Sequence, residues 1–147
     1  MHLRFEQLIH RSRDAIWAIF DDPQGKQLWQ PTLREATLLK GNFGEVGAVT
    51  RLRYNETGPA AEMVETITTI EPPALFAAIY DTPLALNRVT NRFLAVNAEQ
   101  TRWVMECEFR LKGFAIAMTG FAVPMVEQRL RADMARFKAV AEGRDAE

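Results

Sequence analysis

Apolar residues recur along this chain with a period of two over most of its length. The first stretch, HLRFEQLIH, places Leu3, Phe5 and Ile9 on one side of an extended chain and charged residues on the other. Six further segments between residues 35 and 111 alternate in the same way and are separated by turn residues. The last segment has the clearest apolar face, made of Trp103, Met105, Cys107, Phe109 and Leu111. This one-sided alternation predicts a seven-stranded antiparallel sheet that is covered on one face.

A helical period replaces the alternation in three places. Ser12 is a suitable N-cap for a helix over residues 13–22, which Pro23 ends, and GKQLWQP predicts a second short helix that Pro31 stops. A long amphipathic helix is predicted near the C-terminus, with an apolar face made of Val126, Leu130, Met134, Phe137 and Val140. Pro124 is expected either to kink this helix or to split it into an apolar first part and an amphipathic second part.

Composition favours one domain over residues 1–147. The chain is 48% hydrophobic, and 18 basic residues face 19 acidic ones without any concentration of either sign, so nucleic acid is not an expected partner. A single cysteine excludes an internal disulfide and fits the cytoplasm. The longest uncharged run, Gly113 to Val126, is shorter than the roughly 20 residues that span a bilayer, so we expect a soluble protein without a membrane span.

Three glycines, Gly41, Gly44 and Gly47, raise the possibility of a phosphate-binding loop. Such loops lead into a helix and usually carry a Lys-Ser or Lys-Thr pair. Here the β-rich run VTRLRY follows, so the sequence favours a turn between two strands.

The order of these elements resembles the START-like superfamily, also known as SRPBCC or polyketide cyclase/dehydrase and lipid transport. The motifs that carry the resemblance are AIWAIFDDPQGKQLWQP, GEVGAVTRLRY, MVETITTIEPPALF, VTNRFLAV followed by TRWVMECEF, and RFKAVAEG in the closing helix. The resemblance implies an α+β helix-grip fold, in which a curved seven-stranded sheet wraps around the C-terminal helix. It also implies a cavity between them for apolar or amphipathic molecules. Because the family includes cyclases, hydrolase-like enzymes and carriers, the fold alone does not choose a function.

Catalytic constellations are scarce in the sequence. The only histidines, His2 and His10, both lie near the first strand. The sequence therefore gives little support for a nucleophile activated by histidine or for a histidine-rich metal site. Cys107 shares a face with apolar residues that raise a thiol pKa, which favours inert packing. No metal and no cofactor are implied.

Polar residues at inward positions are more informative. Asn91 shares the face of Val89 and Phe93, and Glu65 shares the face of Met63 and Ile67. A buried polar group without a partner costs about 1 to 3 kcal/mol. These two side chains therefore either bond a neighbour or orient the polar end of an apolar ligand, and both interpretations stay open.

The candidate ligand-binding set combines polar, aromatic and sulfur-containing side chains expected to face the cavity. Its members are Trp29, Tyr54, Glu65, Tyr80, Asn91, Phe93, Trp103, Met105, Cys107, Phe109, Met118, Phe121 and Met125. The last three are included because the uncharged 113–126 segment is more apolar than one sheet face needs, and it would also suit a gate.

An empty cavity would be costly. At roughly 24 cal/mol per Å³, a dry void of about 500 Å³ costs near 12 kcal/mol, which is comparable to the stability of a whole domain. The cavity is therefore expected to be partly wetted, collapsed or filled.

Three functions remain after this reasoning. The first is binding of a small lipid, polyketide or quinone-like molecule between sheet and helix. The second is a cyclase or dehydratase in which Glu65 is the general base and Tyr54 or Asn91 polarises a carbonyl. The third is a partner-binding module with a solid core, which docks through the open sheet face or around Trp29. A homodimer is compatible with all three.

Overall fold

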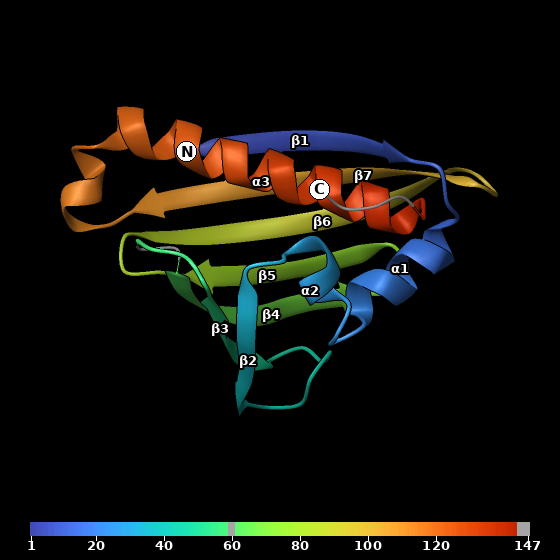
Figure 1. The fold of residues 1–147 in the computed structure, drawn as a ribbon, viewed down its shortest axis with the longest axis horizontal. Coiled ribbons are helices and arrows are strands. Elements are labelled where there is room, and N and C mark those ends of the chain that lie inside the picture. Colours follow the sequence, from blue (N-terminus) through green and yellow to red (C-terminus); the bar gives the residue numbers. More distant parts are fainter. Residues whose placement is uncertain (59–60, 144–147) are drawn as a thin grey trace.

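The computed structural model describes residues 1–58 and 61–143, and within them it has the predicted α+β helix-grip architecture. Seven antiparallel strands form one curved sheet in the order β1-β7-β6-β5-β4-β3-β2. Helix α3 (Thr119–Ala141) crosses one face of this sheet (Figure 1). The strands are β1 (His2–Ile9), β2 (Leu33–Lys40), β3 (Val49–Tyr54), β4 (Glu62–Glu71), β5 (Leu75–Asp81), β6 (Ala85–Asn97) and β7 (Gln100–Leu111). The shorter helices are α1 (Arg13–Asp21), α2 (Lys26–Trp29) and the 3₁₀ helix η2 (Gly113–Ile116).

Local signals account for the helix boundaries after β1. Ser12 has extended backbone angles, and its Oγ accepts the Ala15 N–H at 3.2 Å, which satisfies one of the free donors at the start of α1. Asp14 adds a negative charge to the first turn. Residues 22–25 then form a turn that contains Pro23, and α2 ends before Pro31.

The glycine-rich segment is a connection between strands, as expected. Gly41 and Gly47 have φ values of 78° and 90°, which side chains with a Cβ rarely adopt. The Gly47 N–H donates to the Ile67 carbonyl at 2.9 Å, and β3 follows directly. No helix starts within residues 41–54, so this loop lacks the geometry of a phosphate site.

An aromatic cluster joins the sheet to the C-terminal half of α3. Phe137 of α3 is fully buried, and its ring centroid lies 5.0 Å from that of Trp103 on β7 and 5.3 Å from that of Trp29 on α2. Phe20 of α1 packs against Phe137 at 5.9 Å, and Phe93 stacks on Trp103 at 5.9 Å. One apolar core therefore ties α1, α2 and α3 to the sheet.

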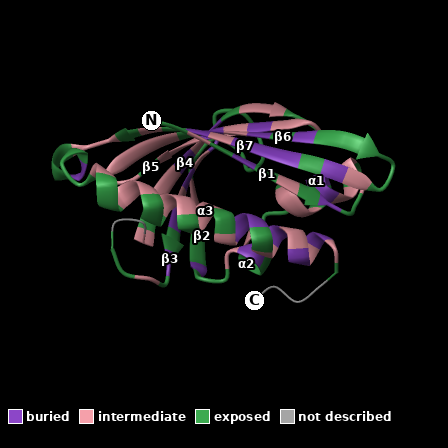
Figure 2. Cartoon of the chain, turned by 90° about the horizontal axis from the view of Figure 1, so that it is seen from above, coloured by how far each residue is buried: buried purple, intermediate pink, exposed green. Residues whose placement is uncertain are grey.

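The two halves of α3 are packed differently. Buried residues begin at Asp133 and continue to Ala141, whereas residues 119–132 are half-buried or exposed (Figure 2). The helix is continuous through Pro124, so of the two predicted outcomes the split is wrong and a kink stays a prediction. Pro124 is only the sixth residue of α3 and removes a single hydrogen bond, to the Gly120 carbonyl, close to the helix start. The chain changes direction earlier, between η2 and Thr119.

Removing the Phe137 ring should strongly destabilise the fold. We expect Phe137→Ala to lower the free energy of unfolding by about 3 to 5 kcal/mol, because it leaves a cavity among tightly packed rings. Phe114→Ala, which removes a ring that is 71% exposed, should change it by less than about 0.5 kcal/mol. Urea unfolding of both variants provides the comparison, and equal effects would contradict this description of the core.

Candidate functional site

A row of polar side chains crosses the concave face of the sheet. Thr50 pairs with Glu65, Glu65 with Tyr80, and Tyr80 with Asn87, on four neighbouring strands from β3 to β6. Residues directly opposite each other in an antiparallel sheet point to the same face. The neighbouring rows on this face are apolar, and they are made of Leu52 with Met63 on one side and Ile67, Ala78, Val89 and Cys107 on the other. We call Thr50, Glu65, Tyr80 and Asn87 the polar row.

Glu65 is the centre of the strongest interactions in the polar row. Lys26 reaches it from α2, with 3.1 Å between Nζ and Oε2, and the Tyr80 hydroxyl donates to the same Oε2 at 2.7 Å. The Lys26 Nζ also lies 5.6 Å from the centre of the Tyr80 ring. Within the described part of the chain, both hydrogen bonds to Glu65 end on Oε2, which leaves Oε1 for another donor.

Electrostatics keep both donors protonated. Burial has the largest single effect on the pKa of Lys26 and lowers it, but the charge of Glu65, the hydrogen bond to it and the nearby Tyr54 and Asp133 together raise it more, so the net shift is upward. Burial and the Glu65 carboxylate raise the pKa of Tyr80 well above its ordinary value. Near neutral pH the site therefore holds an ammonium and a neutral phenol against one carboxylate.

A second polar cluster lies beside the first, between α2, β3 and α3. The Tyr54 hydroxyl donates to Gln30 Oε1 at 2.9 Å, and Gln30 Nε2 donates to Asp133 Oδ2 at 3.2 Å. The Arg136 guanidinium donates to Asp133 at 3.1 Å, and the Arg129 guanidinium lies 4.8 Å from the centre of the Tyr54 ring. Burial raises the pKa of Asp133 to about 6, and the arginines offset only part of this shift. Burial also raises the pKa of Tyr54.

The two inward asparagines of β6, Asn87 and Asn91, differ in the hydrogen bonds that their side-chain amides make. Trp103 Nε1 donates to Asn91 Oδ1 at 2.9 Å, and Asn91 Nδ2 donates to the Phe76 carbonyl at 3.4 Å. Both ends of this amide are therefore bonded within the core. Asn87 lies close enough to Cys107 to lower the pKa of that thiol, but its own Oδ1 is buried and has no partner among the described residues.

Most of the predicted aromatic and sulfur-containing residues form the closed core. Trp29, Phe93, Trp103, Met105 and Cys107 are all buried. Trp29 is only 6% exposed, so its own side chain is not accessible to a docking partner. Burial raises the pKa of the Cys107 thiol to about 12, and the nearby Asn87 lowers it only in part, so the thiol is protonated and unsuited to nucleophilic attack.

Met118, Phe121 and Met125 do not face the interior. They are 46%, 71% and 66% exposed, together with Phe114 and Ile116 of η2. Ala122, Val123 and Val126 of α3 face Leu3, Phe109 and Leu111 of the sheet, and the helical period turns Phe121 and Met125 to the other side of the helix. Figure 1 shows that η2 and the start of α3 lie near the end of β7. The expectation that these three side chains line an interior cavity is therefore wrong for this conformation.

The sheet and the first half of α3 pack closely, and little space is left between them. A crevice of about 10 Å³ lies between them, lined by Leu3, Phe109 and Leu111 of the sheet and Ala122, Val123 and Val126 of α3. Phe109 pairs with Asn87, so the crevice adjoins the end of the polar row. Of the predicted site residues, Phe109 borders this crevice, and Glu65 and Tyr80 belong to the row that leads to it.

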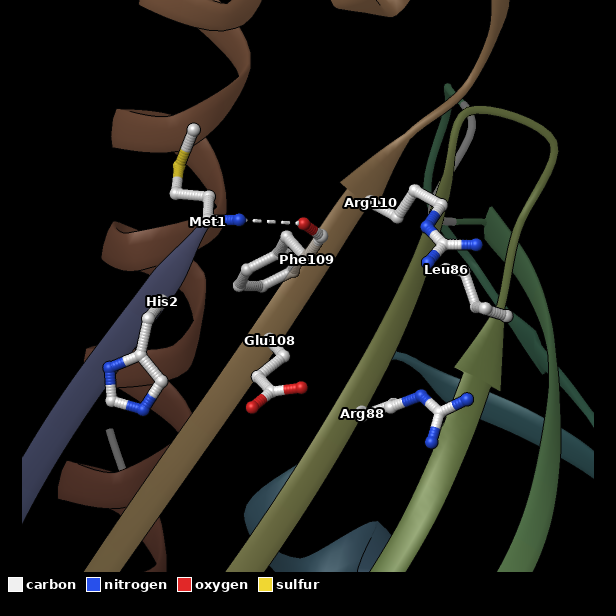
Figure 3. Close-up of a pocket in the computed structure, with 7 residues that line it drawn as sticks. All are labelled: Met1, His2, Leu86, Arg88, Glu108, Phe109 and Arg110. Atoms are coloured by element: carbon white, nitrogen blue, oxygen red, sulfur yellow. Dashed lines mark hydrogen bonds between the residues drawn. The ribbon is translucent and has the colours of Figure 1, made fainter.

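A larger hollow of about 520 Å³ lies on the opposite face of the sheet (Figure 3). His2, Leu86, Arg88, Glu108 and Arg110 line it, and their strand positions alternate with the inward Leu3, Asn87, Val89 and Phe109. Met1 and Phe109 complete its lining, which therefore mixes the charged Arg88, Glu108 and Arg110 with apolar side chains on the face of the sheet away from α3.

Comparison with known proteins identifies the family. A sequence profile described as polyketide cyclase/dehydrase and lipid transport matches residues 2–142. The chain belongs to this family. The START-like resemblance inferred from the motifs is thereby confirmed, whereas a search of curated proteins found no match.

Solved structures agree with the helix-grip fold of the family. The Zhui aromatase/cyclase from Streptomyces sp. R1128 is 17% identical, with a TM-score of 0.80 over 97% of this chain and 93% of that chain. Norcoclaurine synthase from Thalictrum flavum is 13% identical, with a TM-score of 0.74 over 95% and 85% of the two chains. A protein from Arthrobacter aurescens is 21% identical, with a TM-score of 0.72 over 97% and 86%.

The described residues contain neither a metal-binding cluster nor a helix that could span a membrane. Among residues 1–58 and 61–143, no three His, Cys, Asp or Glu side chains gather closely enough to hold a metal ion. In the same part of the chain, no helix combines the length and hydropathy needed to cross a bilayer.

Sequence reasoning missed three residues of this site. Asn87 could have been found, because it precedes Val89 and Asn91 by two and four residues and so shares their face. Thr50 shares a face with Leu52 and Tyr54 in the same way. Lys26 gave no signal, because a four-residue helix has too little periodicity to show which side chain faces inward.

Protonation of Asp133 should stabilise the protein as the pH falls. Its folded pKa of about 6 lies above the ordinary 3.8, so its contribution is fully present below about pH 4 and is lost as the pH rises through about 6. We expect the stability of the wild type relative to Asp133→Asn to increase by up to roughly 3 kcal/mol between about pH 7 and pH 4. Urea unfolding across this range measures the difference, and a constant difference would refute the shift.

Proposed function

We propose that this protein binds a small amphipathic molecule between the concave face of its sheet and the first half of α3. The observation that carries the proposal is the polar row, with its Lys26–Glu65 ion pair, between two apolar rows of the concave face. Small-molecule sites in proteins are mostly apolar and contain a few polar groups whose positions orient the ligand.

Stability alone gives little reason for these polar residues. A buried ion pair usually stabilises a protein no more than well-packed apolar side chains of similar volume, because both charges lose their hydration. Glu65 is 8% exposed, and it lies between apolar rows that could continue across its position. A polar partner on a ligand gives the free Oε1 of Glu65 a hydrogen bond that the described residues do not supply.

Binding requires the first half of α3 to move away from the sheet. A crevice of about 10 Å³ is at the lower limit for a single water molecule, so it cannot hold a ligand as it stands. This half of the helix contacts the sheet through Ala122, Val123 and Val126, which are small to medium in size. Pro124 also lacks the N–H that would bond the Gly120 carbonyl, which weakens the helix there. The aromatic cluster at Phe137 holds the other half in place.

The polar end of the ligand should be uncharged. Lys26 and Glu65 already neutralise each other, so a further buried charge would have no partner and would pay its full desolvation cost. A hydroxyl or carbonyl group meets no such penalty. In the norcoclaurine synthase structure, dopamine and hydroxybenzaldehyde both carry aromatic hydroxyl groups, although the amine of dopamine is charged near neutral pH, so only the hydroxyl is a precedent for this proposal.

Removing the ion pair should abolish selection for a hydroxyl group. We expect the wild type to bind 2-naphthol about tenfold more tightly than naphthalene, as one buried hydrogen bond allows. The double variant Lys26→Met/Glu65→Leu, which leaves neither charge unpaired, should bind the two compounds about equally. Isothermal titration calorimetry measures both affinities.

The exposed i,i+4 pair Glu127–Arg131 provides the matched control. Glu127→Leu/Arg131→Met removes an ion pair on the surface of α3 and should preserve the preference for 2-naphthol. If neither compound binds the wild type, the proposal fails and the solid-core partner module becomes the better hypothesis.

A catalytic role for Glu65 is the second candidate, favoured by the buried carboxylate with one free oxygen. The structure brings Tyr80 and Lys26 to it instead of the expected Tyr54 or Asn91. As a base, Glu65 would take the proton next to a ketone, and the hydroxyl group on the neighbouring carbon would leave as water with a proton from the Lys26 ammonium, which solvent replaces. With 3-hydroxy-1-tetralone this elimination gives the keto tautomer of 1-naphthol, which enolises to 1-naphthol, whose fluorescence is easily followed. Glu65→Gln should lower such a rate by roughly 10²-fold or more and leave 2-naphthol bound, whereas an unchanged rate would exclude this role.

A further inference from the structure

Asn87 is the least satisfied member of the polar row. Its Oδ1 is buried without a partner among the described residues, although buried side-chain oxygens are normally hydrogen-bonded. On the same strand, Asn91 has both ends of its amide bonded. The unmet hydrogen bond is therefore a local feature of position 87 and does not apply to inward asparagines of β6 in general.

The strand pairing gives the separation between the Asn87 and Glu65 backbones. The two residues lie on β6 and β4 with Tyr80 between them, so their backbones are about two strand spacings, or ~10 Å, apart. Tyr80 leans toward Glu65, because its hydroxyl reaches Oε2 of that residue. Asn87 on the other side adjoins Phe109 and the crevice beneath Val123 and Val126.

We propose that Asn87 binds a second hydroxyl of the ligand, at the opposite end of a flat ring system from the hydroxyl that Glu65 binds. This inference rests on the proposed function. The ligand class is then an uncharged aromatic diol that spans β4 to β6. Its rings lie over the polar row, and its apolar edge packs against Phe109 and Val126.

The chemistry of the two end groups favours hydroxyls. Glu65 Oε1 is an acceptor and needs a donor from the ligand, which a hydroxyl supplies. A hydroxyl both donates and accepts, so it satisfies the free end of the Asn87 amide in either orientation of that amide. A fatty acid or a sterol offers only one polar end and would leave one of the two positions unmet.

The test compares 2,6-dihydroxynaphthalene, which has hydroxyls at opposite ends of its ring pair, with 2-naphthol. By isothermal titration calorimetry, the wild type should bind the diol about tenfold more tightly, as a second buried hydrogen bond allows. In Asn87→Leu this ratio should fall to about one, while the affinity for 2-naphthol stays within about threefold of the wild type. Asn87→Ala provides a second variant if leucine disturbs folding.

Thr90→Val is the matched control, because Thr90 lies on the same strand but faces away from α3, between Val89 and Asn91. This isosteric change should leave the diol preference intact. An unchanged preference in both Asn87 variants, or equal affinities of the wild type for the two compounds, overturns the role of Asn87 while the proposed function survives. If 2-naphthol itself does not bind, both proposals fall together.

Discussion

The packing of Phe137 against Trp103 and Trp29 is the constraint on which the rest of this structure depends. These rings fix the C-terminal half of α3 to the sheet and bring α1 and α2 into the same core. The first half of the helix contacts the sheet through smaller side chains only. The C-terminal half of α3 is therefore held firmly on the sheet, and its first half is held by weaker contacts. The first half is the part of the helix that can separate from the sheet at the lower cost.

The polar row interrupts the apolar packing of the concave face of the sheet. Apolar side chains at these positions would continue the core without any desolvation of charge. The chain instead holds Lys26, Glu65 and Tyr80 together, and the part of it that the structure describes supplies no partner for the Asn87 oxygen. In this arrangement each buried polar group limits what can lie beside it, since an apolar or charged neighbour would leave a hydrogen bond or a charge unsatisfied.

Sequence patterns predicted the sheet, its single covered face and the capping of α1, because these features depend on local periodicity and on single residues such as Ser12. The same alternation correctly turned Glu65 and Asn91 inward, but it could not reveal that Asn91 is bonded to Trp103. The exposure of Phe121 and Met125 was within reach of the same reasoning, because helical periodicity places both away from the apolar face of Val126 and Leu130. Lys26 was not predictable, since only tertiary packing brings α2 over β4.

Cys107 gives the chain a built-in reporter of layer separation. It is the only cysteine, it is fully buried on the face that α3 covers, and its thiol is protonated. An alkylating reagent would need to pass between helix and strands and meet a thiolate before it could react. The rate of its modification therefore records how often the two layers come apart, and a molecule lodged between them would change that rate without any engineered label.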